Sequence, residues 1–293
     1  EDISAETVTA IKSLRDPIKG VTISEEYVRT YTNPGFATHI LGRTGQISGE
    51  EYEKNKANGY GINDIIGKQG IERWAEKYLR GVDGIEGTYA EIDGKKVELS
   101  KTKDPVPGNY VMLTIDSELQ QTLEKSLEST IKGIGNDCNA GGAVVLDVKT
   151  GDTLAIASYP TYDMSTFDED YSKLLENKAN PMLNRAVSGL YSPGSTFKPL
   201  VAIAGIQSGK IRAGDYISCT GIYDHYEDYQ PSCWIYSEYD ATHGPMNATQ
   251  AIENSCNVYF YELGRRLGID TLGEYANKFG MGEYTGIELT EET

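Results

Sequence analysis

The chain has 293 residues, 39% of them hydrophobic, and a formal net charge of −17 at pH 7. This length and composition suit one large domain or two ordinary ones, each with its own core, and argue against intrinsic disorder. Its negative charge repels nucleic acid and anionic membrane surfaces, so we exclude polynucleotide partners. No apolar run of about 18 residues and no signal peptide occur, so we expect any membrane anchor to lie upstream.

Helix and linker signals organise the N-terminal part. Residues 71–79 (IERWAEKYL) carry apolar side chains at helical spacing, and Gly81 ends the pattern. The polar stretch 99–109 (LSKTKDPVPGN) holds two prolines and one glycine, a composition typical of an interdomain linker. We therefore predict two domains, residues 1–107 and 108–293.

The second domain begins with alternating strand and helix signals. We predict a strand over 110–115, and a helix that opens on a capping box at 117–120 (SELQ). The segments 142–148 and 152–158 are rich in Val, Ile, Leu and Ala and flank a Lys-Thr-Gly turn, which predicts a β-hairpin. Further helices are predicted over 195–208, from an Asn247 cap, and over 258–267. This mixture indicates the α+β class.

The stretch SPGSTFKPL (192–200) places Ser195 three positions before Lys198. Side chains at i and i+3 share a helix face, so these two groups can hydrogen bond. A serine hydroxyl needs a neighbouring base to become a nucleophile, and a neutral lysine can be that base. Gly194 permits a sharp turn that leaves Ser195 at a helix N-terminus, where N–H groups favour developing negative charge. The alternative is a solvated lysine near an ordinary helix start.

A second group of polar side chains lies at 254–257 (NSCN), between two predicted helices. Ser255 supplies a hydroxyl and Asn257 an amide. The alternative is a simple helix N-cap, a role that Ser and Asn often take.

These two motifs, STFK at 195–198 and SCN at 255–257, resemble the first two active-site motifs of the penicillin-binding proteins. The stretches HILGRTG and IGKQGIERWAEKYLRG resemble the elongated N-terminal pedestal of class B, monofunctional members of that family. The resemblance implies a pedestal, or dimerisation-type, domain followed by a transpeptidase domain with a serine β-lactamase-like fold.

The family's third motif, Lys-Thr-Gly or Lys-Ser-Gly, follows Ser-x-Asn far downstream, and residues 258–293 do not contain it. We do not assign this role to the triplet at 149–151, because it precedes the nucleophile and lies in the predicted hairpin turn. We therefore expect a transpeptidase domain that is incomplete at its C-terminus and inactive as it stands.

The resemblance implies a D,D-transpeptidase acting on peptidoglycan stem peptides. Ser195 would attack the donor D-Ala-D-Ala bond, neutral Lys198 would take its proton, Ser255 would shuttle a proton, and Asn257 would bind substrate and hold Lys198. An amine acceptor would resolve the acyl-enzyme, β-lactams would acylate Ser195, and no cofactor would be required. The implied partner is a cell-wall glycosyltransferase of the division or elongation machinery, at the extracytoplasmic face of the bacterial membrane.

Two other functions stay open at this point. A β-lactamase or β-lactam sensor would share Ser-x-x-Lys but lack the pedestal, and a β-lactamase also needs a base that activates water. A noncatalytic scaffold of the cell-wall machinery would have a vestigial pocket, which the four intact polar side chains argue against.

The stretch 219–244 is rich in metal-binding residue types. Cys219, Cys233 and His243, with Asp228 or His225 as the fourth ligand, form a set suited to structural zinc. A disulfide and free thiols remain alternatives. We expect Cys256 and Cys138 to be core residues.

Overall fold

The computed structural model describes residues 3–14, 23, 29–85, 89–92, 95–98, 103–135 and 138–292. The chain divides into two compact units. Unit 1 comprises Glu1–Val111 and Thr161–Met182, and unit 2 comprises Met112–Pro160 and Leu183–Thr293. The segment Thr161–Met182 thus belongs with the N-terminal unit, an assignment that the sequence reading did not include. In the described part of the chain, no helix is both long and apolar enough to span a membrane.

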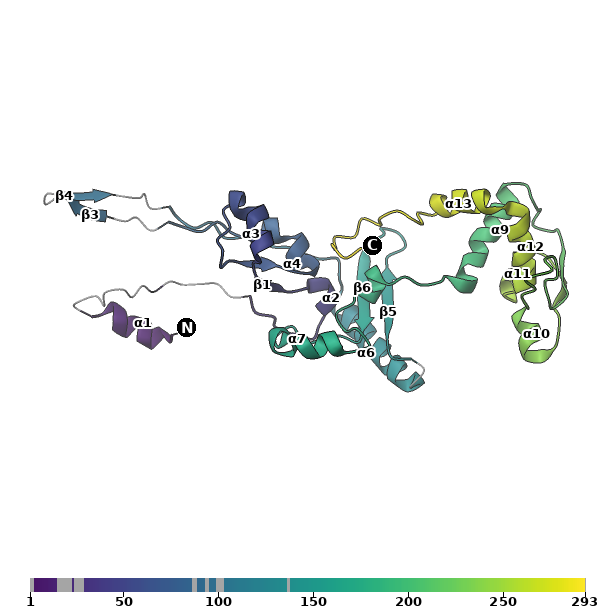
Figure 1. Ribbon diagram of the computed structural model, residues 1–293, viewed down its shortest axis with the longest axis horizontal. Coiled ribbons are helices and arrows are strands. Elements are labelled where there is room, and N and C mark those ends of the chain that lie inside the picture. Colours follow the sequence, from purple (N-terminus) through teal and green to yellow (C-terminus); the bar gives the residue numbers. More distant parts are fainter. Residues whose placement is uncertain are drawn as a thin grey trace. The chain divides into compact units, whose positions relative to one another are not determined.

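Unit 1 combines short helices with two antiparallel strand pairs, β1 with β2 and β3 with β4 (Figure 1). Its elements are α1 (Ala5–Lys12), α2 (Thr38–Leu41), β1 (Thr44–Gln46), α3 (Gly49–Asn55), the 3₁₀ turn η1 (Lys56–Asn58), β2 (Ile65–Gly67), α4 (Gly70–Trp74), α5 (Glu76–Leu79), β3 (Tyr89–Ile92), β4 (Lys95–Glu98) and α7 (Phe167–Glu176).

The predicted helix over 71–79 forms as two pieces, α4 and α5, which meet at Ala75. Close backbone packing explains a glycine in the HILGRTG stretch. Gly42 has φ +72°, and a Cβ there would lie 1.9 Å from the carbonyl oxygen of Gln69. Only glycine accepts both that conformation and that approach.

The segment Thr161–Met182 packs into unit 1 through aromatic and polar contacts. Phe167 is buried beside Tyr162, and the Arg43 guanidinium lies 3.9 Å from the centre of the Phe167 ring. The Thr38 hydroxyl donates to the Tyr162 carbonyl oxygen at 3.3 Å. These contacts explain why the segment, which lies between the two stretches of unit 2 in sequence, belongs to unit 1 in space.

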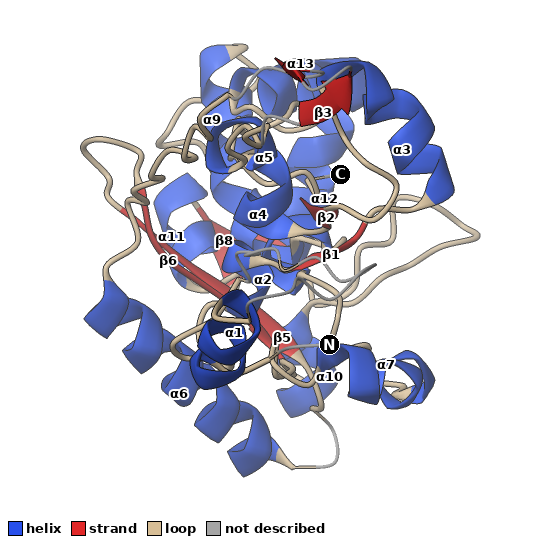
Figure 2. Ribbon diagram, turned by 90° about the vertical axis from the view of Figure 1, so that its left-hand side faces the viewer, coloured by secondary structure: helices blue, strands red, loops and turns tan. Residues whose placement is uncertain are grey.

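Unit 2 contains a β-hairpin with one long helix beside it, and a group of helices with a second strand pair. The elements are α6 (Ser117–Ile134), β5 (Gly141–Leu146), β6 (Thr153–Tyr159), α8 (Arg185–Ser188), the 3₁₀ turn η2 (Gly194–Phe197), α9 (Lys198–Gln207), β7 (Ile217–Cys219), α10 (Trp234–Tyr239), β8 (Gly244–Met246), α11 (Ala248–Glu253), α12 (Asn257–Leu267) and α13 (Ile269–Lys278). The paired strands β5 and β6 are the long red arrows of Figure 2.

The predicted hairpin is confirmed, because β5 and β6 pair antiparallel from Gly141 opposite Tyr159. Helix α6 packs on this hairpin and buries Ile131. Fully buried Gln120 supports this contact, since its side chain accepts from the Ile156 N–H and donates to the Ile156 carbonyl, both at 2.8 Å. The helix is thereby tied to the backbone of β6.

Two local predictions in this region are wrong. Among the described residues, 110–115 form no strand, and the side chains of Tyr110 and Met112 are 102% and 96% exposed. The cap of α6 is Asp116 rather than Ser117, because its carboxylate accepts from the N–H groups of Glu118 and Leu119. A carboxylate at the N-cap also interacts favourably with the helix dipole.

The helical group of unit 2 surrounds one hydrophobic core. Helix α9 packs against α12, α13 and α11, and the 3-residue strands β7 and β8 pair antiparallel beside α12. Leu200, Ala204, Tyr259 and Leu263 are at most 5% exposed in this core. Asn247 caps α11 as predicted, with Gln250 completing a capping box. The core thus fixes the N-termini of α9 and α12, which carry the two sequence motifs.

Candidate active site

Ser195 lies on the 3₁₀ turn η2, directly before α9. Gly194 has φ +55°, a left-handed conformation that glycine adopts without strain, so the chain turns sharply just before the serine. Lys198 begins α9, and Pro199 falls in the first turn, where its missing N–H is tolerated. Ser195 is exposed and Lys198 half-buried, so the nucleophile is open to solvent while its neighbour is anchored.

The second motif joins α11 to α12. Ser255 has φ +47°, a conformation unusual for a residue with a Cβ. Cys256 caps α12, its Sγ accepting from the Tyr259 N–H at 3.4 Å, and Asn257 is the first residue of that helix. The tight turn at Ser255 directs its backbone carbonyl and its hydroxyl toward α9.

The structure brings all four predicted polar residues together through Lys198. Its ammonium donates to the Ser255 carbonyl oxygen at 2.7 Å, to the Ser255 hydroxyl at 3.1 Å and to Asn257 Oδ1 at 2.7 Å. The Ser255 hydroxyl in turn donates to Ser195 Oγ at 2.9 Å. In the part of the chain described, Lys198 therefore connects to Ser195 through Ser255, and not by the direct contact that i, i+3 spacing suggested.

Burial lowers the pKa of Lys198, because desolvation penalises the ammonium form. Negative charge on the nearby Cys233 and Cys256 thiols acts in the opposite direction. The sequence reading expected a second cation to assist this fall in pKa, whereas burial is the cause found here. A lysine with a lowered pKa reaches its neutral, basic form at a lower pH.

Beside this group lies a cluster of thiols and one imidazole, which we call the Cys₃His cluster: Cys219, Cys233, His243 and Cys256. One potential ligand atom from each residue lies within 4.8 Å of all the others. All three cysteines are buried, and all four cysteines of the chain are free thiols rather than disulfide-bonded.

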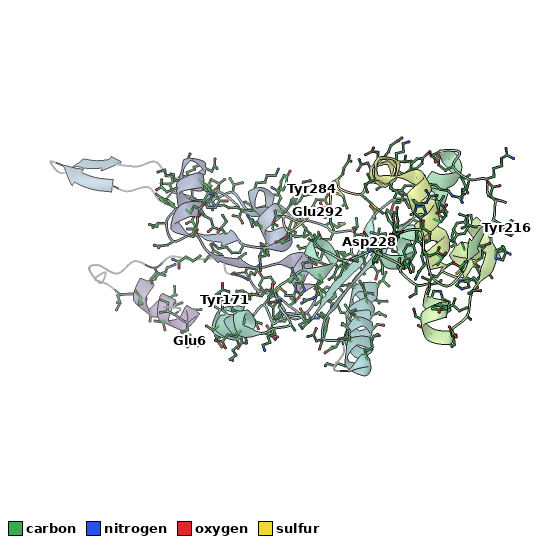
Figure 3. All side chains as sticks on the ribbon, turned by 45° about the vertical axis from the view of Figure 1, so that its right-hand side comes forward. Glu6, Tyr171, Tyr216, Asp228, Tyr284 and Glu292 are labelled. Carbon is green, nitrogen blue, oxygen red and sulfur yellow. The ribbon has the colours of Figure 1, made fainter. Side chains whose placement is uncertain are left out.

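The structure corrects the predicted fourth member of this set. Asp228, labelled in Figure 3, and His225 are exposed and lie outside the cluster. His225 instead stacks on Tyr223, with ring centres 6.0 Å apart. Cys256 is buried in the core as expected, and it also takes the fourth place in the cluster. Cys138 is half-buried, and its Sγ contacts the Ala140 carbonyl oxygen at 3.7 Å.

The cluster contains groups with different affinities for protons. Burial opposes ionisation of Cys233, but N–H groups of Asn257, Val258 and Ile235 directed at its sulfur outweigh it and lower its pKa. Burial raises the pKa of Cys256 to about 12. Burial and the charge of Lys198 together lower the pKa of His243, which favours neutral imidazole, the form that binds metals.

Three contacts that the sequence did not predict hold the second motif from outside. Asn257 donates its backbone N–H to Cys233 Sγ at 3.4 Å, and its side-chain amide contacts the Ser232 carbonyl oxygen at 3.4 Å. Trp234 donates its indole N–H to the Asn254 carbonyl oxygen at 3.0 Å. The only signal in the sequence was that Ser232 and Trp234 flank a predicted metal ligand.

Comparison with known families gives two matches that cover most of the chain. The family described as "Penicillin binding protein transpeptidase domain" matches residues 141–293. The family described as "Penicillin-binding Protein dimerisation domain" matches residues 1–113.

Individual proteins agree with these matches. The peptidoglycan D,D-transpeptidase MrdA of Escherichia coli K12 is 33% identical over 298 aligned residues, which cover 97% of this chain and 44% of that protein. The complex between PBP2 and MreC from Helicobacter pylori has a TM-score of 0.76 at 28% identity, covering 90% of this chain and 48% of that one. A structure described as "Structural coordination of polymerization and crosslinking by a peptidoglycan synthase complex" has a TM-score of 0.74 at 31% identity, covering 90% and 47%. The chain thus spans less than half the length of these relatives.

Proposed function

Because the chain belongs to the penicillin-binding protein family, we propose that it acts as part of a peptidoglycan D,D-transpeptidase that works through a serine acyl-enzyme. One observation carries this proposal. The hydrogen-bonded series from Lys198 through the Ser255 hydroxyl to Ser195 Oγ joins a base of lowered pKa to an exposed nucleophile. Acyl transfer by serine requires these two elements.

The hydrogen bonds of Lys198 suggest how a proton moves between Ser195, Ser255 and Lys198. An ammonium has three N–H donors, and Lys198 has three hydrogen-bond acceptors around it, so the observed arrangement suits the protonated, resting form. Loss of one proton gives Lys198 a lone pair that can face the Ser255 hydroxyl. Ser255 then donates to Lys198 and accepts from Ser195, which reverses the direction of both hydrogen bonds.

Ser195 Oγ then attacks the carbonyl carbon of the penultimate D-Ala, and its proton passes through Ser255 to Lys198. As the tetrahedral intermediate collapses, the same route returns the proton to the leaving amine, and terminal D-Ala departs. An acceptor amine repeats the sequence in reverse and forms the crosslink. Asn257 holds Lys198 throughout, and the Ser195 N–H on η2, directly before α9, is one donor to the oxyanion. We propose that β-lactams acylate Ser195 by the same first step.

We extend the proposal to the setting of the enzyme. Relatives named as a PBP2–MreC complex and as a peptidoglycan synthase complex support a place within the cell-wall machinery, with a glycosyltransferase as partner. The family relationship supports residues 1–107 as the pedestal, 108–293 as transpeptidase domain, and an extracytoplasmic, membrane-anchored location. Because no Lys-Thr-Gly or Lys-Ser-Gly follows Asn257, we propose that these 293 residues by themselves are inactive.

Turnover of a synthetic stem peptide ending in D-Ala-D-Ala tests this function in the full-length protein as its gene encodes it. We expect release of D-Ala in the wild type and none in Ser195→Ala, together with a long-lived penicillin adduct. Rapid hydrolysis of penicillin would instead identify a β-lactamase. Absence of both D-Ala release and adduct would leave the scaffold function.

We also propose that the Cys₃His cluster binds one structural zinc ion. Three thiols and one imidazole are a ligand set that Zn²⁺ takes in structural sites, and the four ligand atoms lie within 4.8 Å of one another. The imidazole also faces the thiols, because His243 Nδ1 lies 3.6 Å from Cys233 Sγ. When bound, zinc would supply a link between β7, α10 and the start of α12, and no chemical step.

Metal content tests this second proposal without reference to activity. We expect about one equivalent of zinc per wild-type chain by elemental analysis after dialysis, as for a four-ligand structural site. Cys219→Ser should lose that zinc, whereas Cys138→Ser should retain it because Cys138 lies outside the cluster. Metal-free wild-type protein that stays folded would contradict the proposal.

A further inference from the structure

The start of α10 contacts the second motif at two points. Cys233 Sγ accepts from the Asn257 backbone N–H at 3.4 Å. One residue on, Trp234 Nε1 donates to the Asn254 carbonyl oxygen at 3.0 Å. The two contacts lie on either side of Ser255, so α10 holds the turn at both ends.

The Trp234 contact acts on the peptide group that sets the Ser255 conformation. The carbonyl of Asn254 and the N–H of Ser255 belong to one planar peptide unit. Trp234 holds the carbonyl side, and the Ser255 N–H donates to the Ile252 carbonyl oxygen at 3.0 Å. Both polar atoms of this unit are therefore fixed, which restricts its rotation.

This restriction matters because Ser255 has φ +47°. A side chain with a Cβ takes that conformation only when its surroundings hold it there. If this hold were lost, φ at Ser255 could relax toward a negative value, and the Ser255 carbonyl and hydroxyl would then change their orientation toward Lys198. The connection from Lys198 to Ser195 would then be lost without any change in the reacting side chains.

Trp234 is itself held in place, as this role requires. The preceding residue, Cys233, donates its backbone N–H to the Gly221 carbonyl oxygen at 2.7 Å. The indole ring packs edge-on against His243 and Tyr239, with ring centres 5.7 Å and 6.3 Å away. A purely structural role is the alternative: the indole N–H would only satisfy a carbonyl at the end of α11 and would not affect catalysis. Acylation kinetics distinguish this structural role from a positioning role.

We propose that Trp234 is a positioning residue for acylation: its indole N–H holds the Asn254–Ser255 peptide so that Ser255 links Lys198 to Ser195. The inference rests on the proposed acyl-transfer function. The indole N–H of Trp234 contacts Asn254 and acts on the reacting groups only through the Ser255 turn, so we expect its loss to lower the rate of acylation and to leave the affinity for the ligand unchanged.

Stopped-flow acylation by a chromogenic penicillin tests this inference in the full-length protein, because it resolves the noncovalent Kd and the acylation rate constant. Two variants remove the N–H: Trp234→Phe, and incorporation of benzothienylalanine at position 234, which keeps the ring shape and replaces N–H by sulfur. The matched control is Trp74→Phe, since Trp74 belongs to unit 1 and is 39% exposed, against 37% for Trp234.

We expect the acylation rate constant to fall about tenfold in both position-234 variants, the effect of losing one hydrogen bond. The Kd and zinc content of the benzothienylalanine protein should match the wild type, as should all properties of Trp74→Phe. A rate constant within twofold of wild type in the benzothienylalanine protein would overturn the inference and leave the proposed function intact. A wild type that penicillin does not acylate would overturn the proposed function, and the inference with it.

Discussion

Replacing Ser255 by alanine and by glycine separates its chemical role from its conformational one. Both changes delete the hydroxyl that connects Lys198 to Ser195, at 3.1 Å and 2.9 Å respectively. Both leave the Lys198 contacts with the residue-255 carbonyl and Asn257 available. We therefore expect the two variants to lose acylation equally, by about 10²–10⁴-fold, the usual contribution of a positioned proton-transfer group.

The same two variants should differ in stability. At φ +47° a residue with a Cβ is strained by about 1–2 kcal/mol, and glycine is not. Glycine loses about 0.4–1 kcal/mol of that advantage through the greater freedom of its unfolded chain. The net expectation is that Ser255→Gly is more stable than Ser255→Ala by about 1 kcal/mol, or roughly 2–4 °C in thermal midpoint for a domain of this size.

Calorimetry and penicillin acylation of both variants in the full-length protein measure the two quantities side by side. Equal loss of acylation with a higher midpoint for glycine is the expected result. Alanine as stable as glycine would refute the strain at Ser255. Acylation within tenfold of wild type in either variant would refute the role of its hydroxyl as a proton relay.

Three further predictions concern stability. Gln120→Ala should lower the free energy of unfolding in urea by about 2–5 kcal/mol, because it leaves the buried N–H and carbonyl of Ile156 unpaired; a loss below 1 kcal/mol would contradict this. The hydrogen bond from Arg265 lowers the pKa of Glu262 to about 2, so ionised Glu262 adds stability above about pH 4.5, and this stability is lost as the pH falls toward 2. The loss in free energy of unfolding caused by Glu262→Gln, measured in urea, should therefore be smaller at pH 3 than at pH 6. A loss that is the same at both pH values would exclude the contribution of the ionised carboxylate. Phe167→Ala should cost about 3–5 kcal/mol and expose Thr161–Met182 to limited proteolysis, whereas unchanged cleavage would argue against its docking on unit 1.

Local patterns predicted the chemistry of the site better than its connections. The spacing of Ser195 and Lys198 predicted their proximity, because i and i+3 are neighbours on any helical turn. The spacing gave no information on the Ser255 hydroxyl that stands between them, because this contact joins residues 60 positions apart. The α12 start at Asn257 was likewise readable from sequence, while its sulfur contact with Cys233 was not.

The metal-ligand set shows the same limit. Cys219, Cys233 and His243 were recognisable as residue types common in zinc sites, and the structure places them together. The fourth member was missed because a buried cysteine usually packs as a small hydrophobe, and Cys256 lies outside the 219–244 stretch that holds the other three ligands. Its direction depends on the left-handed turn at Ser255, which no sequence pattern reveals for a serine.

Regular elements were predictable where one segment contained the whole signal. The β5–β6 hairpin has both strands and their turn within 19 consecutive residues, from Gly141 to Tyr159, and it formed as predicted. The segment 110–115 is apolar and contains β-branched residues, as strands often are, but strand formation needs a partner, and no described segment pairs with it. The membership of Thr161–Met182 in unit 1 depends on long-range aromatic packing, which composition does not show.

The most direct test of the account is the mass of the full-length protein before and after exposure to penicillin, followed by peptide mapping of any adduct. The account predicts a single penicilloyl addition on the peptide that contains Ser195, absent in Ser195→Ala and stable over many minutes. An adduct on any other residue, or none at all in folded wild-type protein, would contradict the assignment of Ser195 as the acylated nucleophile.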